Sequence, residues 1–468
     1  MNEILKEDLK NLELILNQVK AEGLEFLDGI DRRPTSVKNR EIANCDLEEY
    51  GSGALAALAE FKSRFDETIV ASTGPRYWGF VTGGSTPAAI AGDWLATVYD
   101  QNTQTIKGQG DISANIELET VRLLLQLLGL PDEDYLGGFV TGATMSNFTC
   151  LAVARQWLGM QNGRDIAREG VSGTLNVLSA MPHSSSVKSL ALLGFGSQNL
   201  IKVKVMPGNR EAIDLNDLEK QISKLKGQPF ILISSGGTVN TVDFDDFEGI
   251  LRLKDKYHFW WHIDAAFGAF AACAPAYRHL LKGWEEADSI TVDCHKWLNV
   301  PYENAFFLVK KEHRLLQIAS FQNSNAPYLG DPLENFNYLN FLPENSRRLK
   351  ALPAWFSLKA YGAKGYQDIV ESCIARAQEL AAFMEEEDAF ELLAPVRLNT
   401  VCFSLKGEAY KDQVFEYLRV LNDKGVVFMT PTIYDGRQAI RAAFVNWRTT
   451  NDDVLIAIDS LRQALKSL

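Results

Sequence analysis

The sequence predicts an α/β fold, with a large domain built on a largely parallel sheet and a smaller α+β domain after it. Short β-rich runs alternate with helical patterns through the middle of the chain, which is typical of strands joined by helical crossovers. After about residue 347 the pattern changes to long helical segments and weaker strands. A helix with an apolar stripe precedes both regions. We therefore expect three parts, at residues 1–70, 71–345 and 346–468.

The first part contains a predicted amphipathic helix over residues 4–19. Its apolar side chains recur every three or four positions, which places them on one face. These side chains are Leu5, Leu9, Leu12, Leu16 and Val19. Such a stripe needs a partner, and either the body of the same chain or a second subunit would serve. Because soluble enzymes commonly form symmetric oligomers, we expect a homodimer with this helix between the subunits, and docking on the body is the alternative.

The second and third parts contain most of the predicted strands. In the second part they span residues 173–180, 201–206, 230–235, 259–264, 289–292 and 305–309, with helical patterns at 215–225 and 247–256. In the third part we expect helices at 352–361 and 366–385 and strands at 400–405 and 426–428. In a fold of this kind, binding sites form at the carboxyl ends of the parallel strands.

Composition and charge exclude several classes of function. Apolar residues make up 46% and charged residues 23%, the balance of an ordinary soluble protein. The net charge of -13, without a block rich in Lys and Arg, argues against binding to nucleic acid. The most apolar stretch, residues 259–277, contains His262 and Asp264 and is a poor candidate for a membrane span.

The spacing of the cysteines and the first ten residues indicate what kind of protein this is and where it is located. The six cysteines show no C-x-x-C pair, which argues against a zinc site or a disulfide framework. The first ten residues alternate charges where a signal peptide has an apolar run. We therefore expect a cytoplasmic protein without a metal and without membrane association.

Two predicted strand ends carry the clearest chemistry. The strand at 259–264 ends in Asp264, where a carboxylate can hold a protonated nitrogen or a hydroxyl. The strand at 289–292 leads into His295, Lys296 and Trp297. A lysine in this setting is partly desolvated, which favours Schiff-base chemistry. A strand-end aspartate alone often caps a turn, but the pair supplies the lysine and the pyridinium partner that pyridoxal phosphate (PLP) requires.

Two further segments complete a possible cofactor site. Residues 139–147 read as a strand, a turn of small residues and a helix start, so that backbone N–H groups could hold a phosphate there. This turn matches neither the Walker nor the Rossmann pattern. His183 follows another predicted strand, and its flat ring could cover the cofactor. Capping of the next helix is the alternative role for His183.

These four segments, in this order, resemble the group II PLP-dependent amino-acid decarboxylases, which include the aromatic-amino-acid, histidine, glutamate and diaminobutyrate decarboxylases. The resemblance runs from about Arg76 to the C-terminus, and its most specific pieces are residues 264–266 and 295–297. It implies the type I fold of PLP-dependent transferases, as in aspartate aminotransferase. It also implies decarboxylation of an L-amino acid to an amine and CO₂ through a Schiff base on Lys296.

The resemblance assigns the cofactor-binding residues. Asp264 is expected to pair with the pyridinium nitrogen and His183 to stack on the ring. The phosphate ligands are expected to be Ala143, Thr144 and His295. The full implied set is Ala143, Thr144, His183, Thr238, Asp264, Ala266, His295 and Lys296.

The resemblance also indicates where substrate binds. Phe80 and Thr82 lie in a stretch that matches the region lining the substrate pocket, and Arg347 matches the arginine that follows the family's mobile loop. All three are expected to bind substrate. Tyr328, in a segment rich in Asn, Pro, Gly and Asp, is the expected proton donor after CO₂ leaves, with Tyr338 as the competitor. Met145 departs from the family pattern, because many relatives carry an acidic residue there. We therefore predict no particular amino acid as the substrate.

Two other functions stay open at this point. An aminotransferase or a retro-aldol lyase could use the same fold and the same lysine, because neither feature fixes the bond that breaks. A non-catalytic binding module that has kept the scaffold is the third hypothesis. The presence of both Asp264 and Lys296 argues against that third hypothesis.

Overall fold

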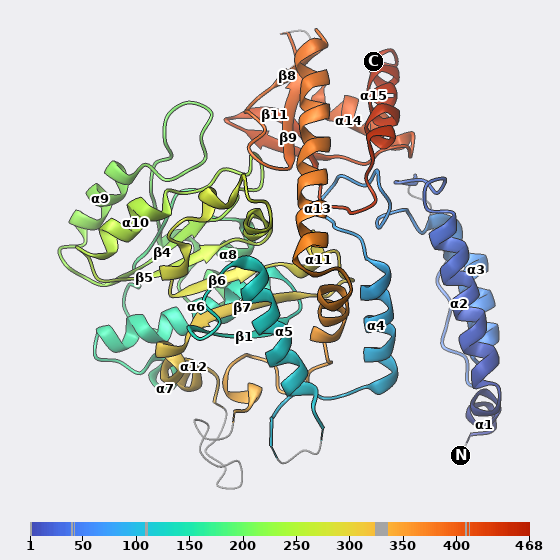
Figure 1. Ribbon diagram of the computed structural model, residues 1–468, viewed down its shortest axis with the longest axis horizontal. Helices are drawn as coiled ribbons and strands as arrows, with labels where there is room; N and C mark the ends of the chain where they lie inside the picture. Colours follow the sequence, from blue (N-terminus) through green and yellow to red (C-terminus); the bar gives the residue numbers. More distant parts are fainter. Residues whose placement is uncertain are drawn as a thin grey trace.

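A seven-stranded sheet forms the centre of the computed structural model, which describes residues 2–38, 41, 43–107, 111–322, 336–407, 410 and 412–468 (Figure 1). The strand order is β1-β7-β6-β5-β4-β2-β3. Strand β7 runs antiparallel to both of its neighbours, β1 and β6, and all other neighbouring pairs are parallel. The strands are β1 (Tyr135–Val140), β2 (Val177–Ser179), β3 (Leu200–Lys202), β4 (Phe230–Ser235), β5 (Phe259–Asp264), β6 (Ser289–Val292) and β7 (Ala305–Lys310). The predicted, largely parallel sheet is thus confirmed.

Alternation along the central strands produces two apolar cores, one on each face of the sheet. Phe230 and Trp261 belong to one core, while their chain neighbours Ile231 and Trp260 belong to the other. This is the two-residue period of a strand that is buried on both sides. The long helix α6 (Ala143–Gln161) and helix α8 (Ser184–Leu192) contribute to the second core.

The remaining helices of the large body cover the first core or continue around the sheet. The first core receives side chains from α5 (Ser113–Leu128), α9 (Leu215–Lys224) and α10 (Phe247–Lys254). The short helices α7 (Ile166–Glu169), α11 (Cys294–Trp297) and α12 (Arg314–Phe321) complete the body, with 3-10 turns between several elements. None of the helices in the described part of the chain is long and apolar enough to cross a membrane.

The C-terminal region packs a small antiparallel sheet against helices, as the sequence predicts (Figure 1). Its strand order is β10-β11-β9-β8, and the strands are β8 (Phe390–Leu392), β9 (Thr400–Leu405), β10 (Thr430–Tyr434) and β11 (Arg437–Ala443). The helices are α13 (Ala351–Glu386), α14 (Val414–Asp423) and α15 (Asn451–Leu465). Helix α13 is broken at Gly362, whose φ of 59° separates the two predicted helices.

Three predicted strands differ from the structure. The strand expected at 426–428 is wrong, because only Phe428 makes an isolated bridge, to Tyr77. The strand expected at 201–206 ends at Lys202, and of the strand expected at 173–180 only Val177–Ser179 forms. These segments carry β-favouring side chains, but the residues in question lie in loops outside the named strands.

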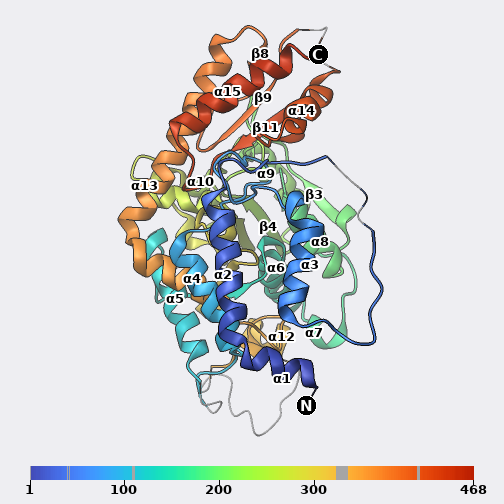
Figure 2. The same cartoon turned by 90° about the vertical axis from the view of Figure 1, so that its right-hand side faces the viewer.

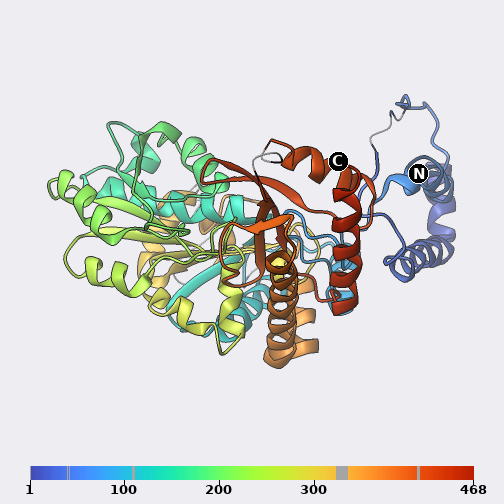
Figure 3. The same ribbon diagram turned by 90° about the horizontal axis from the view of Figure 1, so that it is seen from above.

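The N-terminal helices form an arm that stands away from the body (Figures 1 and 3) and faces the viewer in Figure 2. The arm consists of α1 (Glu3–Lys10), α2 (Leu12–Asp28) and α3 (Ala54–Phe65), and none of the three helices contains a buried residue. Helix α4 (Pro87–Tyr99) lies between the arm and the body. The side chains of the predicted apolar stripe are exposed, from 42% at Val19 to 65% at Leu9. The stripe therefore does not dock on the described part of the body of its own chain.

Candidate active site

The candidate site lies at the carboxyl ends of the central parallel strands. Residues Ser235, Asp264 and Thr291 are in register across β4, β5 and β6, so the loops that follow these strands emerge side by side. A cavity at this edge brings together five residues that the sequence singles out. Its lining includes His183, Thr238, Asp264, Ala266 and Lys296.

Lys296 lies at the edge of this cavity with its amine beside a carboxylate. Its Nζ is 3.3 Å from Oδ2 of Asp293 and 5.5 Å from the centre of the Phe267 ring. The other Asp293 oxygen is 3.3 Å from Nδ1 of His295. Burial favours the neutral form of Asp293, but Lys296 and His295 outweigh it and lower the pKa of that carboxyl below its ordinary value. Asp293 thus holds the lysine in place as a charged partner.

Asp264 is the last residue of β5, and three hydrogen-bond donors converge on its carboxylate. Oδ2 accepts from Nδ2 of Asn147 at 3.0 Å and from Oγ of Ser186 at 3.1 Å. Oδ1 accepts from the backbone N–H of Ala266 at 3.3 Å. A carboxylate held in this way at the floor of a cavity is suited to a protonated ring nitrogen.

His183 presents a neutral ring to the same cavity. It precedes helix α8, and its Nδ1 lies 2.7 Å from Oγ of Ser185 and 3.3 Å from the Ser185 backbone nitrogen. Burial lowers the pKa of His183, although the charge of Asp264 opposes this shift. Both the capping role and the ring-covering role that the sequence suggests are compatible with this position.

The first turn of helix α6 provides a place for a phosphate. Ala143 and Thr144 begin this 19-residue helix, whose first N–H groups have no partner within the helix. A side chain at Gly142 would come within 3.5 Å of Cε1 of His295, so the helix start and His295 face each other closely. The three predicted phosphate ligands are therefore neighbours, and their donors suit an anion.

The segment at residues 78–84 packs directly on the lysine segment. The backbone N–H of Gly83 donates to the carbonyl of His295 at 3.2 Å, and a Cβ at Gly83 would lie 1.5 Å from the carbonyl oxygen of Lys296. Only glycine fits this approach. Thr82 lies next to it, with its hydroxyl 3.1 Å from that of Tyr302. Phe80 is 61% exposed and packs on Phe428.

Arg347 is buried in a network of its own, away from the lining of the cavity. Its guanidinium pairs with Glu117, donates to the carbonyl of Phe139 at 2.7 Å and lies 4.5 Å from the centre of the Tyr338 ring. The Tyr338 hydroxyl donates to the Gly137 carbonyl at 3.3 Å. This arrangement does not support direct binding of substrate by Arg347, because an internal carboxylate already neutralises it. Tyr328 lies outside the described residues.

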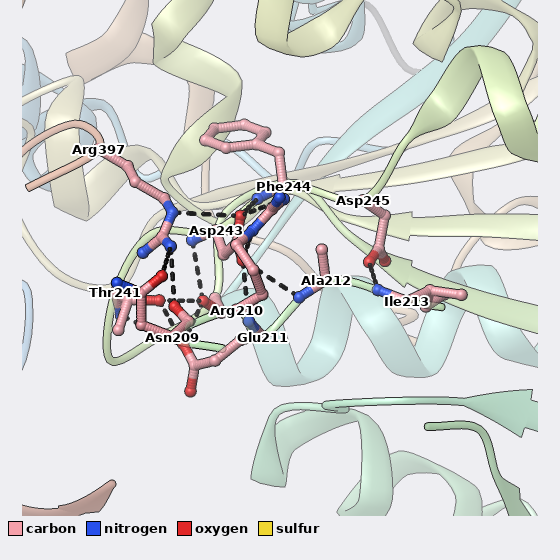
Figure 4. A network of polar contacts seen from close by, with 11 residues as sticks. Asn209, Arg210, Glu211, Ala212, Ile213, Thr241, Asp243, Phe244, Asp245 and Arg397 are labelled. Carbon is pink, nitrogen blue, oxygen red and sulfur yellow. Dashed lines mark hydrogen bonds and ion pairs between the residues drawn. The ribbon is translucent and has the colours of Figure 1, made fainter. Parts of the chain in front are cut away.

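The sequence analysis missed two carboxylates that line the cavity, Glu211 and Asp245. Glu211 accepts hydrogen bonds from the hydroxyls of Thr238 and Thr241, and Asp243 beside it pairs with two arginines, Arg210 and Arg397 (Figure 4). These residues lie in loops, where no periodic pattern marks them.

Burial raises the pKa of Asp245 to about 7, although it accepts backbone hydrogen bonds from Ile213 and Ser235. Asn147 was also missed, although it lies one helical turn after Ala143 and therefore on the same face of α6.

Comparison with known proteins identifies the family. The pyridoxal-dependent decarboxylase conserved domain matches residues 47–406. The chain belongs to this family. The resemblance seen in the sequence, to the group II PLP-dependent decarboxylases, is thereby confirmed.

Several relatives of this decarboxylase share nearly its whole length. The aromatic-L-amino-acid decarboxylase of Bacillus atrophaeus is 27% identical, and the alignment covers 95% of each chain. The L-2,4-diaminobutyrate decarboxylase of Rhizobium meliloti is 26% identical, over 90% of this chain and 84% of the relative. The crystal structure of Oryza sativa TDC with PLP and tryptamine superposes with a TM-score of 0.88 over 98% of each chain, at 21% identity. This superposition confirms the type I fold.

PLP is the cofactor of this family, and the site fits it. The cavity offers an amine at Lys296, a carboxylate at Asp264 and a neutral ring at His183, while the start of α6 and His295 offer donors for a phosphate. These are the groups that an aldehyde, a pyridinium nitrogen, an aromatic face and a phosphate need. The family and the chemistry of the site agree.

Proposed function

We propose that this decarboxylase converts an L-amino acid into the corresponding amine and CO₂, with PLP attached to Lys296. The observation that carries the proposal is the shared cavity in which the amine of Lys296 and the carboxylate of Asp264 both lie. When bound, PLP supplies a pyridinium ring that accepts the electron pair released as CO₂ leaves. The residues of the chain hold the reacting groups in place around it.

Each residue has one task in this proposal. Asp264 keeps the ring nitrogen protonated, and His183 and Ala266 cover the two faces of the ring. Ala143, Thr144 and His295 hold the phosphate, and Thr238 lies beside the ring. Because a bond to the carboxylate breaks most easily when it lies perpendicular to the ring, these contacts select the reaction by orientation.

Substrate contacts and proton return are proposed for the segments near the mouth. Thr82 is placed to meet a substrate through its hydroxyl, with Phe80 nearby. We assign the return of a proton to the substrate α-carbon to Tyr328, on the basis of the sequence resemblance alone. Tyr338 is a weaker candidate, because its hydroxyl is buried and already donates to Gly137.

We further propose that the protein is a homodimer in which the N-terminal arm packs on the partner. The support is the exposed apolar stripe on α1 and α2, which is not covered by any of the residues that the structure describes. Burying several leucines between subunits would remove a large apolar surface from water. A cytoplasmic location stays a prediction from the sequence, as do the domain boundaries near residues 70 and 345.

The substrate class is proposed from the relatives as an aromatic L-amino acid or L-2,4-diaminobutyrate. The purified protein with PLP should be incubated with each standard amino acid, with L-2,4-diaminobutyrate and with cysteine sulfinate, measuring CO₂, amine, aldehyde and keto acid. We expect equal amounts of CO₂ and amine from one substrate. A keto acid without CO₂ would instead support an aminotransferase, and no turnover of any substrate would contradict the proposal.

A further inference from the structure

A continuous line of buried hydrogen bonds leads from the centre of the sheet to Asp264. Nε1 of Trp260 lies 2.9 Å from Oγ of Ser289, which lies 2.9 Å from Nδ1 of His262. Nε2 of His262 lies 2.8 Å from Oδ1 of Asn147, and Nδ2 of Asn147 lies 3.0 Å from Oδ2 of Asp264. The first four side chains are fully buried. None of the four lines the cavity.

The orientation of the Asn147 amide follows from its neighbours. Its nitrogen can only donate, and it lies near two oxygens, Oδ2 of Asp264 and Oγ of Ser185 at 3.1 Å. If the amide were rotated by half a turn, its oxygen would face the Asp264 carboxylate, and two acceptors would lie in contact. With the nitrogen toward Asp264, the amide oxygen faces His262 and needs a proton from it.

The position of the proton on His262 is also determined by Trp260 and Ser289, at the other end of the line. The Trp260 N–H can only donate, so the Ser289 oxygen accepts from it and directs its own proton to Nδ1 of His262. Burial lowers the pKa of His262 to about 4, so the ring carries one proton near neutral pH. That proton is on Nε2. Every bond in the line therefore donates toward Asp264.

We propose that His262 is a positioning residue for the cofactor: its Nε2–H fixes the Asn147 amide so that Asp264 receives a donor on Oδ2 and keeps Oδ1 directed at the cofactor nitrogen. The inference rests on the proposed function only in taking Asp264 as the partner of that nitrogen. His262 contacts neither Lys296 nor the cavity. Its hydrogen-bonded route to Asp264 passes through Asn147.

A purely structural role for His262 predicts something different. If the ring only fills space between the sheet and α6, then a phenylalanine of similar shape would serve better than a flexible glutamine. If the Nε2–H matters, the order is reversed, because the glutamine amide can donate to Asn147 through its nitrogen and accept from Ser289 through its oxygen. The two variants His262→Phe and His262→Gln therefore separate the roles.

The experiment measures the dissociation constant of the apoprotein for PLP and, separately, the unfolding midpoint of the apoprotein. We expect His262→Phe to weaken PLP binding by about 10- to 100-fold, because an Asn147 amide that is no longer held in orientation loses its hydrogen bond to the charged Asp264 carboxylate, and His262→Gln to restore most of the binding. The control is Tyr417→Phe, which removes a buried hydrogen bond to Leu461 in the C-terminal region. It should lower the midpoint and leave PLP binding unchanged.

Equal weakening by His262→Phe and His262→Gln, or none in His262→Phe, would overturn the proposal. A second measurement covers the case in which a variant does not fold. Ring ¹⁵N shifts of the wild-type apoprotein, labelled at its six histidines, should show His262 protonated at Nε2 and not at Nδ1 near pH 7. A proton on Nδ1 would refute the inference. Because this measurement uses no PLP, it is independent of the proposed reaction, whereas unchanged PLP binding in Asp264→Ala would instead refute the pairing of Asp264 with the cofactor nitrogen that the proposed function assumes.

Discussion

The cavity and the N-terminal arm differ in whether their side chains find contact partners within one chain. Around Asp264 the polar atoms have protein partners, and the donors come from α6, α8 and the loop after β5. On α1 and α2 the apolar side chains meet water instead, and no residue of either helix is buried. The hydrogen bonds around Asp264 are therefore made within a single chain, while the apolar side chains of the arm stay exposed in the described part of that chain.

The largest expected effect is at Lys296. Replacing it with alanine removes the amine that carries PLP, so turnover should fall to the background of the assay. Lys310 is a suitable control, because its amine lies near Glu286 at the surface rather than in the cavity. Lys310→Ala should keep normal turnover. Substantial activity in Lys296→Ala would mean that the reaction does not pass through this lysine.

The next effect is at Asp264. Asp264→Ala removes the carboxylate that keeps the ring nitrogen protonated, and we expect kcat to fall by about 10³-fold or more. Steady-state kinetics at saturating PLP separates this loss from weak cofactor binding. Near-normal kcat would show that the ring lies in another orientation.

A third prediction concerns Tyr328 and the fate of the substrate. Tyr328→Phe should still release CO₂ but form little amine, because the α-carbon lacks its proton donor. Aldehyde should then form in place of amine, either with the amino group left on the cofactor as pyridoxamine phosphate or, with oxygen as the oxidant, with release of ammonia. Measuring CO₂, amine and aldehyde together decides the point, and Tyr338→Phe tests the competing donor in the same way. An amine-to-CO₂ ratio that Tyr328→Phe leaves unchanged would remove Tyr328 from the reaction.

The arm supplies a prediction for association rather than catalysis. Leu9→Asp together with Leu16→Asp places charge on the exposed stripe and should shift the protein from dimer to monomer, as should removal of the residues before Asp31. Analytical ultracentrifugation measures the mass. Glu13→Gln, at an exposed position on the same helix as Leu16, is the control and should leave the dimer intact. A dimer that survives both changes would show that the arm is not part of the interface.

The smallest effect is on the pH dependence of stability. The pKa of Asp245 is raised to about 7 from 3.8, so its contribution to stability is complete below about pH 4 and is lost as the pH rises through 7. The pKa of His262 is lowered from 6.5 to about 4, so its contribution is present above pH 6.5 and is lost as the pH falls through 4. The two slopes oppose each other in the wild-type protein.

Asp245→Asn removes the first slope and leaves the second. The free energy of unfolding, measured by denaturant titration from pH 4 to pH 7, should therefore rise more steeply with pH in this variant than in the wild type. An unchanged slope would show that Asp245 is already ionised across this range.

Much of this fold could be predicted because the central strands are continuous apolar runs. The strands at 230–235, 259–264 and 289–292 match β4, β5 and β6 residue for residue. Edge strands such as β8 and β10 were missed, since their residues are only partly buried and carry no strong pattern. The break in α13 at Gly362 falls between the two helices predicted at 352–361 and 366–385.

The residues of the candidate site could be predicted where a reactive side chain lies at the end of a strand or directly after it. Asp264 and Lys296 follow their strands within a few residues, so the fold alone places them at one edge of the sheet. Glu211 and Asp245 were not predictable, because loops bring them to the cavity. Arg347 matches a position of the family in the sequence. Its ion pair with Glu117 was not predictable, because no local sequence pattern indicates a contact between residues so far apart in the chain.

The central claim is that PLP is carried by Lys296, and mapping the site of attachment tests it most directly. The holoenzyme is reduced with borohydride, digested and examined by mass spectrometry. We predict a pyridoxyl phosphate adduct on the peptide that contains Lys296 and none on the other lysine peptides, with no adduct at all from Lys296→Ala. An adduct on a different lysine, or a holoenzyme that yields no adduct, would contradict the account.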